Sequence, residues 1–215
     1  MERIQAFSSP LVALPVENID TDQIIPARYL KITDKAGLAD GLFADWRYDP
    51  EGRPREDFPL HGEAARAARI LVAGHNFGCG SSREHASWAL LGFGFRAVVS
   101  TYFADIFASN ALKNGLLPIV VEPAVHARIL ALAAAAPGGD GGRGTRPEII
   151  VDLEARTLTL PDGEAVRFPI DPFARQCLLA GLDQLGFILA EEAALASYEA
   201  AHPGRVDTTA AVRAP

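Results

Sequence analysis

The stretch 69-RILVAGHNFGCGSSREHASWALLGFG-94 predicts a strand, a glycine-rich loop and a helix, one after another. Its first residues, 69–74, are branched, apolar and ended by glycine, and its last residues, 84–94, carry apolar side chains at helical spacing. The pattern recurs, with strands expected at 96–102 and 117–122 and helices at 104–115 and 124–136. Strands that alternate with helices pair in parallel, so the sequence predicts an α/β fold with a mainly parallel central sheet and flanking helices.

A different pattern follows this region. The stretch 137-PGGDGGRGTRP-147 consists mostly of turn-forming residues and predicts a surface loop. Short segments separated by turns then predict an additional antiparallel region, with strands at 148–155, 157–161 and 164–170. Two helices are expected next, at 172–190, with a break near Gly181 or Gly186, and at 191–201. We expect a single domain over residues 1–201 and a flexible tail over residues 202–215.

Two N-terminal segments have a less regular pattern. Residues 16-VENIDTDQIIPARYLKIT-33 contain Pro26 and many polar residues, which favours an ordered loop over a pair of strands. Residues 41–60 are rich in proline, glycine and charge, yet they include the aromatic residues Phe43, Trp46, Tyr48 and Phe58. Aromatic residues in such a loop indicate either packing against their own domain, the commoner case, or a contact surface.

The composition disfavours several classes of protein. The 215 residues are 49% hydrophobic, enough for a substantial core, and their formal net charge of −7 provides no general attraction for nucleic acid or for an anionic membrane. The N-terminus lacks the basic start and apolar run of a secretory signal, and the best candidate for a membrane span, 124–136, is short and contains His126 and Arg128. We therefore expect a soluble cytoplasmic protein in which Cys79 and Cys177 stay reduced.

The glycine-rich loop is the candidate site. It connects the end of a strand to the start of a helix, where open α/β sheets usually bind ligands and where the helix N-terminus favours an anion. Its spacing is not the dinucleotide pattern G-x-G-x-x-G, and no G-K-[ST] follows as a phosphate loop would require. Arg83 offers a planar guanidinium suited to a carboxylate, and Ser81 and Ser82 supply hydroxyls beside it. These groups favour a small carboxylic acid as the ligand.

Each residue of the loop also has an ordinary structural interpretation. Ser81 or Ser82 could be the N-cap of the helix, as serines before a helix often are. Cys79 has no second cysteine nearby, so a small structural residue is the simpler interpretation. His75 and His85 lack the spacing of a metal-binding pair, and we expect no metal site here.

A second polar cluster lies at Asp20 and Asp22, on either side of Thr21. Such a pair of acids can bind a divalent ion, but it is more often a turn or a helix cap. A third possibility is an acid that orients the cluster of Ser81 and Arg83 across the site. The residues alone leave these three possibilities open.

Taken together, the motifs resemble the small subunits of 3-isopropylmalate dehydratases, which belong to the aconitase superfamily. The resemblance rests on NIDTDQIIPARYLK at 18–31, GHNFGCGSSREHASWALL at 74–91, FADIFASNALKNGLLPIV at 103–120 and IDPFARQCLLAGLDQLGFIL at 170–189. It covers nearly the whole chain, and the glycine-rich run is specific to the swivelling domain of this superfamily. The resemblance therefore implies a single swivelling α/β domain.

The resemblance also implies a reaction, a partner and a cofactor. It implies a hydro-lyase that converts 2-isopropylmalate to 3-isopropylmalate through isopropylmaleate, in leucine biosynthesis. In this family the chain is active only as a heterodimer with a large subunit, which holds a [4Fe-4S] cluster through three cysteines. No cluster is then expected in this chain, since Cys79 and Cys177 do not match those ligands.

Residue by residue, the resemblance assigns roles to the loop. Ser81 corresponds to the catalytic base, Ser82 to a position that hydrogen-bonds the substrate, and Arg83 to the arginine that binds a carboxylate. Asp22 corresponds to an acid at the edge of the site that orients other groups.

The resemblance places substrate selection at Leu30 and Lys31, in the loop after I-I-P, which faces the group that differs between substrates. Leu30 and Ile32 suit an isopropyl group, whereas the cations Arg28 and Lys31 would suit an extra carboxylate. A related homoaconitate or citraconate hydratase is therefore the alternative substrate assignment. A module that binds a small carboxylic acid without turning it over is an alternative of another class.

Overall fold

The computed structural model describes residues 1–31, 37–61, 63–134 and 147–202. The chain divides into two compact units, Met1–Asp183 and Gln184–Pro215. The expected loop at 137–147 and the expected tail at 202–215 fall almost entirely outside the described residues. The single domain expected over residues 1–201 stays a prediction.

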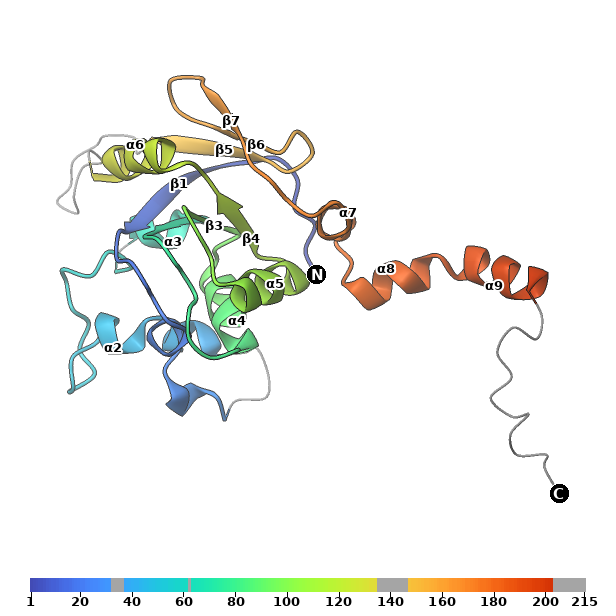
Figure 1. Cartoon of the computed structure of the whole chain (residues 1–215). Coiled ribbons are helices and arrows are strands. Elements are labelled where there is room, and N and C mark those ends of the chain that lie inside the picture. Colours follow the sequence, from blue (N-terminus) through green and yellow to red (C-terminus); the bar gives the residue numbers. More distant parts are fainter. Residues whose placement is uncertain (32–36, 62, 135–146, 203–215) are drawn as a thin grey trace. The chain divides into compact units, whose positions relative to one another are not determined.

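The first unit is built around a seven-stranded sheet with the order β4-β3-β2-β1-β5-β6-β7 (Figure 1). The strands are β1 (Phe7–Leu14), β2 (Ile70–Ala73), β3 (Ala97–Ser100), β4 (Leu117–Val120), β5 (Glu148–Asp152), β6 (Thr157–Thr159) and β7 (Ala165–Arg167). Pairs from β1 through β4 are parallel, whereas β1–β5, β5–β6 and β6–β7 are antiparallel. The predicted α/β fold, a parallel sheet with an additional antiparallel region, is therefore confirmed.

Strand β1 joins the two halves of the sheet. On one side Leu11 lies opposite Ile70 of β2 in a parallel pair, and on the other side Phe7 lies opposite Val151 of β5 in an antiparallel pair. No strand is predicted here from the sequence, because serines and a proline precede the apolar half of 7-FSSPLVAL-14. The central strand of the sheet was thus missed.

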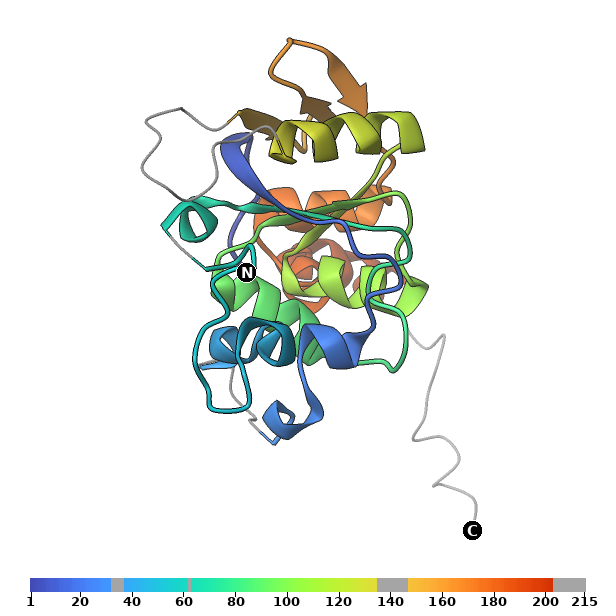
Figure 2. The same ribbon diagram turned by 90° about the vertical axis from the view of Figure 1, so that its left-hand side faces the viewer.

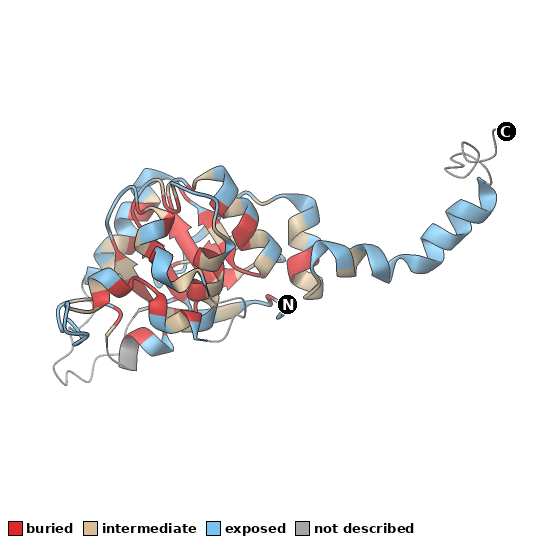
Figure 3. Ribbon diagram, turned by 90° about the horizontal axis from the view of Figure 1, so that it is seen from below, coloured by how far each residue is buried: buried red, intermediate tan, exposed pale blue. Residues whose placement is uncertain are grey.

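Helices cover both faces of the sheet. Alternate residues of β1, β2 and β3 enter two different hydrophobic clusters, as in β2, where Leu71 belongs to the first cluster and Ile70 to the second. The first cluster includes residues of α4 (Glu84–Phe93) and α5 (Asp105–Asn114), and the second includes residues of α6 (Pro123–Ala134) and α7 (Pro172–Ala180). Figures 1 and 2 show α6 across the sheet from α4 and α5, and Figure 3 shows the buried residues gathered between these layers.

Glycines end the helices as the sequence indicates. Gly115 follows α5 with a φ of 93°, and its N–H donates to the carbonyls of Ala111 and Leu112. Gly181 ends α7 with a φ of 73°, so the break expected in the helix at 172–190 falls at Gly181. Gly186 instead lies within α8 (Gln184–Ala190) of the second unit, which is followed by α9 (Glu192–Ala201). Over the described part of the chain, none of the helices has the length and hydropathy needed to cross a bilayer.

The remaining short helices lie between β1 and β2. They are α1 (Thr21–Ile24), η1 (Ala27–Tyr29), η2 (Leu38–Gly41), α2 (Ala44–Arg47) and α3 (Glu63–Ala67). The aromatic residues of the 41–60 segment pack inward: Phe43 is fully buried and stacks on Trp46 at 5.7 Å between ring centroids. Trp46 and Phe58 pack against the first hydrophobic cluster. Packing against their own domain therefore explains Phe43, Trp46 and Phe58, whereas Tyr48 lines a cavity.

Candidate active site

The glycine-rich loop is held on one side by the chain that follows β1. The N–H of Gly78 donates to the carbonyl of Ile19 at 2.7 Å, and the N–H of Thr21 donates to the carbonyl of Cys79 at 2.9 Å. The Thr21 hydroxyl adds a third bond, to the carbonyl of Ser81 at 2.8 Å. Three hydrogen bonds thus fix the loop along residues 19–21.

The chain that follows β3 holds the other side of the loop. The N–H of Phe77 donates to the carbonyl of Tyr102 at 3.1 Å, and the N–H of Ala104 donates back to the carbonyl of Phe77 at 3.1 Å. Since β1, β2 and β3 are parallel, their carboxyl ends lie at one edge of the sheet. The loop therefore sits at the edge where open α/β sheets usually bind ligands.

Two glycines are required by this close packing. At Gly78 the φ is +77°, and an added Cβ would lie 2.2 Å from Cγ of Phe107. At Gly74 an added Cβ would lie 2.3 Å from the carbonyl oxygen of Val16. Any side chain at either position would displace backbone or ring atoms, so the loop follows its path only with glycine there.

Ser81 and Ser82 are both exposed, immediately before α4. The N-cap residue of α4 is Arg83, in an extended conformation and without a side-chain capping bond. The interpretation of either serine as the helix N-cap is therefore wrong. Both residues directly precede the first turn of α4, where the backbone N–H groups and the helix dipole favour negative charge.

Arg83 and Asp22 form an ion pair between Nη1 and Oδ1. The Arg83 side chain is 17% exposed and that of Asp22 is 54% exposed, so the guanidinium is the more enclosed partner. Asp22 thus orients Arg83 across the gap between α1 and α4. This contact corresponds to the third possibility that the sequence left open for the two acids.

Asp20 caps a helix, whereas Asp22 pairs with Arg83. Its carboxylate accepts from the N–H of Gln23 at 2.8 Å, while the Gln23 side chain accepts from the N–H of Asp20 at 2.9 Å. This reciprocal capping box starts α1, a helix of four residues. The cap interpretation therefore holds for Asp20, and the cap places Asp22 in the first turn.

The other loop residues have ordinary partners. His75 Nδ1 lies 2.9 Å from the Thr101 hydroxyl, and its ring stacks on Tyr102 at 5.5 Å. Cys79 is half-buried and its Sγ lies 3.4 Å from the carbonyl of Asn18. Within residues 1–31, 37–61, 63–134 and 147–202, no three His, Cys, Asp or Glu side chains form a group that could hold a metal ion.

Leu30 and Lys31 lie at the end of η1. Leu30 is half-buried and is the C-cap of η1, and Lys31 is exposed. The structure brings Asp22 and Arg83 into direct contact and links Ser81 to the same segment through Thr21. It shows no corresponding contact for Leu30 and Lys31, among the residues that it describes. Their role as substrate-binding residues stays a prediction.

Thr21 is the site residue that the sequence analysis did not single out. It is only 2% exposed, and its hydroxyl and N–H both bind the loop. Its position between Asp20 and Asp22 was the available signal, because a small hydroxyl residue at the start of a helix commonly binds neighbouring backbone.

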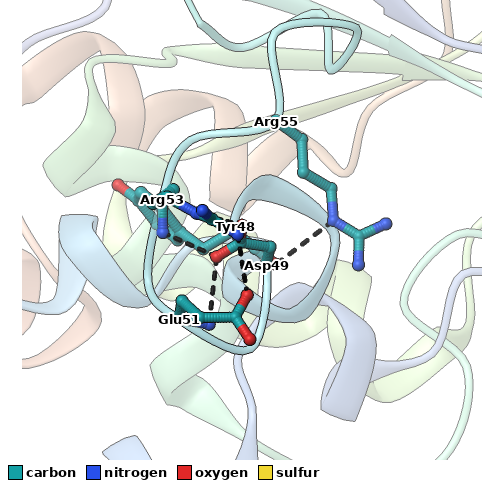
Figure 4. Close-up of polar contacts among 5 residues, drawn as sticks. All are labelled: Tyr48, Asp49, Glu51, Arg53 and Arg55. Carbon is teal, nitrogen blue, oxygen red and sulfur yellow. Dashed lines mark hydrogen bonds and ion pairs between the residues drawn. The ribbon is translucent and has the colours of Figure 1, made fainter.

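A separate cavity of about 640 Å³ lies over the 40–55 region. Its lining includes Arg28, Tyr29, Asp45, Tyr48 and Asp49, and none of the loop residues. The turn at its rim is closed by Asp49, which accepts hydrogen bonds from the backbone of Glu51 and Arg53 and from the Arg53 side chain (Figure 4). These bonds, that from the Arg53 backbone foremost, lower the pKa of the Asp49 carboxyl.

Comparisons with family models and with known proteins point to one family. A family model described as the aconitase C-terminal domain matches residues 2–124, and one described as LeuD_N matches residues 147–172. The small subunit of 3-isopropylmalate dehydratase from Roseiflexus sp. (strain RS-1) is 57% identical over 98% of this chain and 99% of its own length. The corresponding subunit from Anaeromyxobacter dehalogenans (strain 2CP-C) is 58% identical over 93% of this chain and 98% of its own length.

A solved structure shares the fold. The crystal structure of a 3-isopropylmalate dehydratase from Methanocaldococcus jannaschii matches with a TM-score of 0.62 and 24% identity, over 90% of this chain and 99% of that chain. At this identity the likeness speaks for the fold alone.

Proposed function

Because this chain belongs to the family of 3-isopropylmalate dehydratase small subunits, we propose that it is the small subunit of a hydro-lyase that isomerises 2-isopropylmalate to 3-isopropylmalate in leucine biosynthesis. The observation that carries the proposal is the identity of 57% to a subunit of that name over nearly the full length of both chains. The reaction removes water to give isopropylmaleate and adds it back at the neighbouring carbon. Water therefore leaves and returns at adjacent carbons of one bound substrate.

Ser81 is the proposed base, which removes the proton from the carbon next to a substrate carboxylate. A serine hydroxyl is a weak base unless its deprotonated form is stabilised. The exposed Ser81 side chain lies at the start of α4, where unpaired N–H groups and the helix dipole favour an anion. The bond from Thr21 to the Ser81 carbonyl supports the role by fixing the backbone of this residue.

Arg83 is the proposed carboxylate-binding group. Its guanidinium is mostly enclosed and is oriented by Asp22, so it presents its remaining N–H donors in a fixed direction. The exposed Ser82 hydroxyl beside it supplies a further hydrogen bond to the substrate. Asp22 acts through Arg83 and is therefore a positioning residue in this proposal.

The partner is a large subunit that holds the [4Fe-4S] cluster. This chain does not fit a cluster bound through three cysteines, since it contains only Cys79 and Cys177, and Cys177 is 3% exposed in α7. When bound in the partner, the cluster supplies the Lewis acid that helps hydroxide leave. Within the same proposal the pair is cytoplasmic, which agrees with two free cysteines.

The test is turnover by the reconstituted pair. The chain is mixed anaerobically with a cluster-loaded large subunit, and the ultraviolet absorbance of the unsaturated intermediate is followed from 2-isopropylmalate. Replacing Ser81 by alanine is expected to lower kcat by about 10²–10⁴-fold, the usual contribution of a general base. Ser109→Ala, at an exposed serine of α5, is the control and should leave turnover unchanged. Normal turnover by Ser81→Ala would refute the role of Ser81.

Substrate assignment is tested with the same pair. Turnover of 2-isopropylmalate but not of homoaconitate would support the proposal, because unpaired polar groups in a pocket penalise the wrong substrate. The opposite preference would replace isopropylmalate by a tricarboxylic substrate. Tight binding of isopropylmalate by this chain alone, without turnover in the pair, would instead indicate a binding module.

A further inference from the structure

Arg28 is one of the residues that left the substrate assignment open, because an unpaired cation beside the substrate would bind an extra carboxylate. In the structure its Nη1 lies 2.6 Å from Oδ1 of Asp45, in α2, and its guanidinium lies 5.0 Å from the centre of the Tyr29 ring. The hydrogen bond to Asp45 raises the pKa of Arg28. Its charge is thus directed to α2.

This ion pair orients the Arg28 side chain but contributes little to the stability of the fold. Both side chains are more than half exposed, at 55% for Arg28 and 57% for Asp45, and such pairs contribute little free energy in water. The pair nevertheless joins η1 to α2, two short elements that are separated along the chain.

Gly41 provides a stronger constraint on η1. This residue is buried at the end of η2, and an added Cβ would lie 2.8 Å from Cγ of Tyr29 and 2.5 Å from Cδ1 of Ile25. Cδ1 of Ile25 is the end of a flexible side chain, whereas Cγ of Tyr29 is the base of a ring. The absence of a side chain at residue 41 therefore lets Tyr29 lie where it does.

The segment that contains Gly41 is itself held rigidly. The buried Arg47 donates from Nη1 to the carbonyls of Ala39 and Leu42, both at 3.2 Å. The N–H of Phe43 donates to the carbonyl of Ile24 at 2.8 Å, which ties the segment to the end of α1. We call residues 39–47 the anchoring segment.

We propose that the anchoring segment positions Leu30 and Lys31 and so determines which substituent the enzyme accepts on its substrate. The inference rests on the proposed function and on the role, implied by the family resemblance, of these two residues beside that substituent. Tyr29 and Arg28 bind the anchoring segment through packing and an ion pair, and Leu30 follows them directly, as the residue that closes η1. Gly41 and Asp45 are then positioning residues for substrate specificity. Gly41 acts through Tyr29 and Asp45 acts through Arg28.

The first experiment measures amide exchange in the isolated chain. The N–H groups of Tyr29 and Leu30 donate to the carbonyls of Pro26 and Ala27 at 2.9 and 3.1 Å, so their exchange reports whether η1 is held. Gly41→Ala should speed exchange of both amides by about tenfold, since the added methyl group displaces the Tyr29 ring. Unchanged exchange would overturn the inference, whatever the pair does with substrate.

The second experiment compares substrates that differ only in their alkyl group. With the large subunit, Gly41→Ala should lower the ratio of kcat/KM for isopropylmaleate to that for citraconate by about tenfold, in the range that one or two methylene groups contribute to selectivity. The kcat for citraconate should stay within about threefold, because Ser81 and Arg83 are held by other contacts. Equal losses on both acids would overturn the specificity role, since residue 41 would then support the whole site.

Two further variants keep the test decisive. Gly92→Ala is the matched control, because its added methyl group would also face the anchoring segment, at Ala39, but meets nothing closer than 3.5 Å. Asp45→Asn removes the ion pair at the surface without altering the core, and should shift exchange and selectivity in the same direction as Gly41→Ala, by about threefold. If the wild-type pair turns over neither acid, the proposed function fails, and the exchange measurement still decides whether the anchoring segment holds η1.

Discussion

At the scale of single residues, Thr21 connects the two parts of the candidate site. It belongs to α1, the helix that carries Asp22, and its hydroxyl binds the carbonyl of Ser81 at 2.8 Å. Thr21 is buried, so its hydroxyl is largely shielded from solvent, although the Ser81 residue that accepts the bond is exposed. The threonine therefore fixes the distance between the acid that orients Arg83 and the proposed base.

Replacing Thr21 by valine, which has the same shape, is expected to lower kcat of the reconstituted pair by about tenfold with little change in KM, since the loss falls on alignment rather than on binding. It also leaves the Ser81 carbonyl without its partner, at a cost of about 1–3 kcal/mol in the free energy of unfolding. Steady-state kinetics and urea denaturation measure the two effects.

Thr21→Ser is the control for that substitution, because it keeps the hydroxyl and loses only a methyl group. It should restore most of kcat. If serine is no better than valine, the hydroxyl does not position Ser81 and the role of Thr21 is packing alone.

At the scale of elements, the short helix α1 depends on its cap and on its neighbours. A helix of four residues has too few internal hydrogen bonds to be stable by itself. The capping box of Asp20 and Gln23 satisfies two of its backbone N–H groups, and the glycine-rich loop binds it through Thr21. An element this small can be rigid only where tertiary contacts hold it.

Two N-caps of the chain allow a matched comparison. Asp20 caps α1 beside the site, and Asp171 caps α7, where its carboxylate accepts from the N–H of Ala174 at 2.8 Å. Asp20→Ala and Asp171→Ala should each lower the free energy of unfolding by about 1 kcal/mol, the usual loss for an N-cap. Only Asp20→Ala should also lower turnover, because α1 carries Asp22. Equal turnover in the two variants would contradict the link between α1 and the site.

At the scale of the whole first unit, side chains far apart in sequence join the two halves of the sheet. Arg128 of α6 reaches Asp162 and Glu164, in the turn between β6 and β7, at 2.7 Å each. The pKa of Asp162 is lowered, first because the N–H of Glu164 donates to its carboxylate and then because Arg128 lies beside it. The contact links the helix that covers the parallel strands to the antiparallel strands.

This contact predicts a dependence on pH. A carboxyl whose pKa is lower in the folded state stabilises that state above its ordinary value of 3.8, and the contribution is lost as pH falls through the folded pKa. The titration of Asp162, followed by NMR of its carboxyl carbon, should have a midpoint below 3.8, and Arg128→Gln should raise it. Arg175→Gln, at an arginine that binds the carbonyls of Leu153 and Glu154 instead, should leave it unchanged. A midpoint at or above 3.8 in the wild type would contradict the prediction.

The sequence by itself determined those features that depend on neighbouring residues. The alternation of strands and helices predicted the parallel sheet, Gly115 marked a helix end, Gly181 was one of two positions given for another, and the glycine-rich loop gave the candidate site. These signals are local, because periodicity, φ preferences and the spacing of a motif are all set within a few residues. The sequence therefore specified where the candidate site is.

Only the tertiary structure decided which groups meet there. It showed the strand β1, whose residues Phe7 and Leu11 pair with segments more than fifty residues away, and it separated the capping role of Asp20 from the pairing of Asp22 with Arg83. These contacts join segments that are distant along the chain, and no local pattern encodes which distant partner a backbone or a carboxylate finds. The physical reason is that such pairings are chosen by burial and by hydrogen-bond satisfaction over the whole fold.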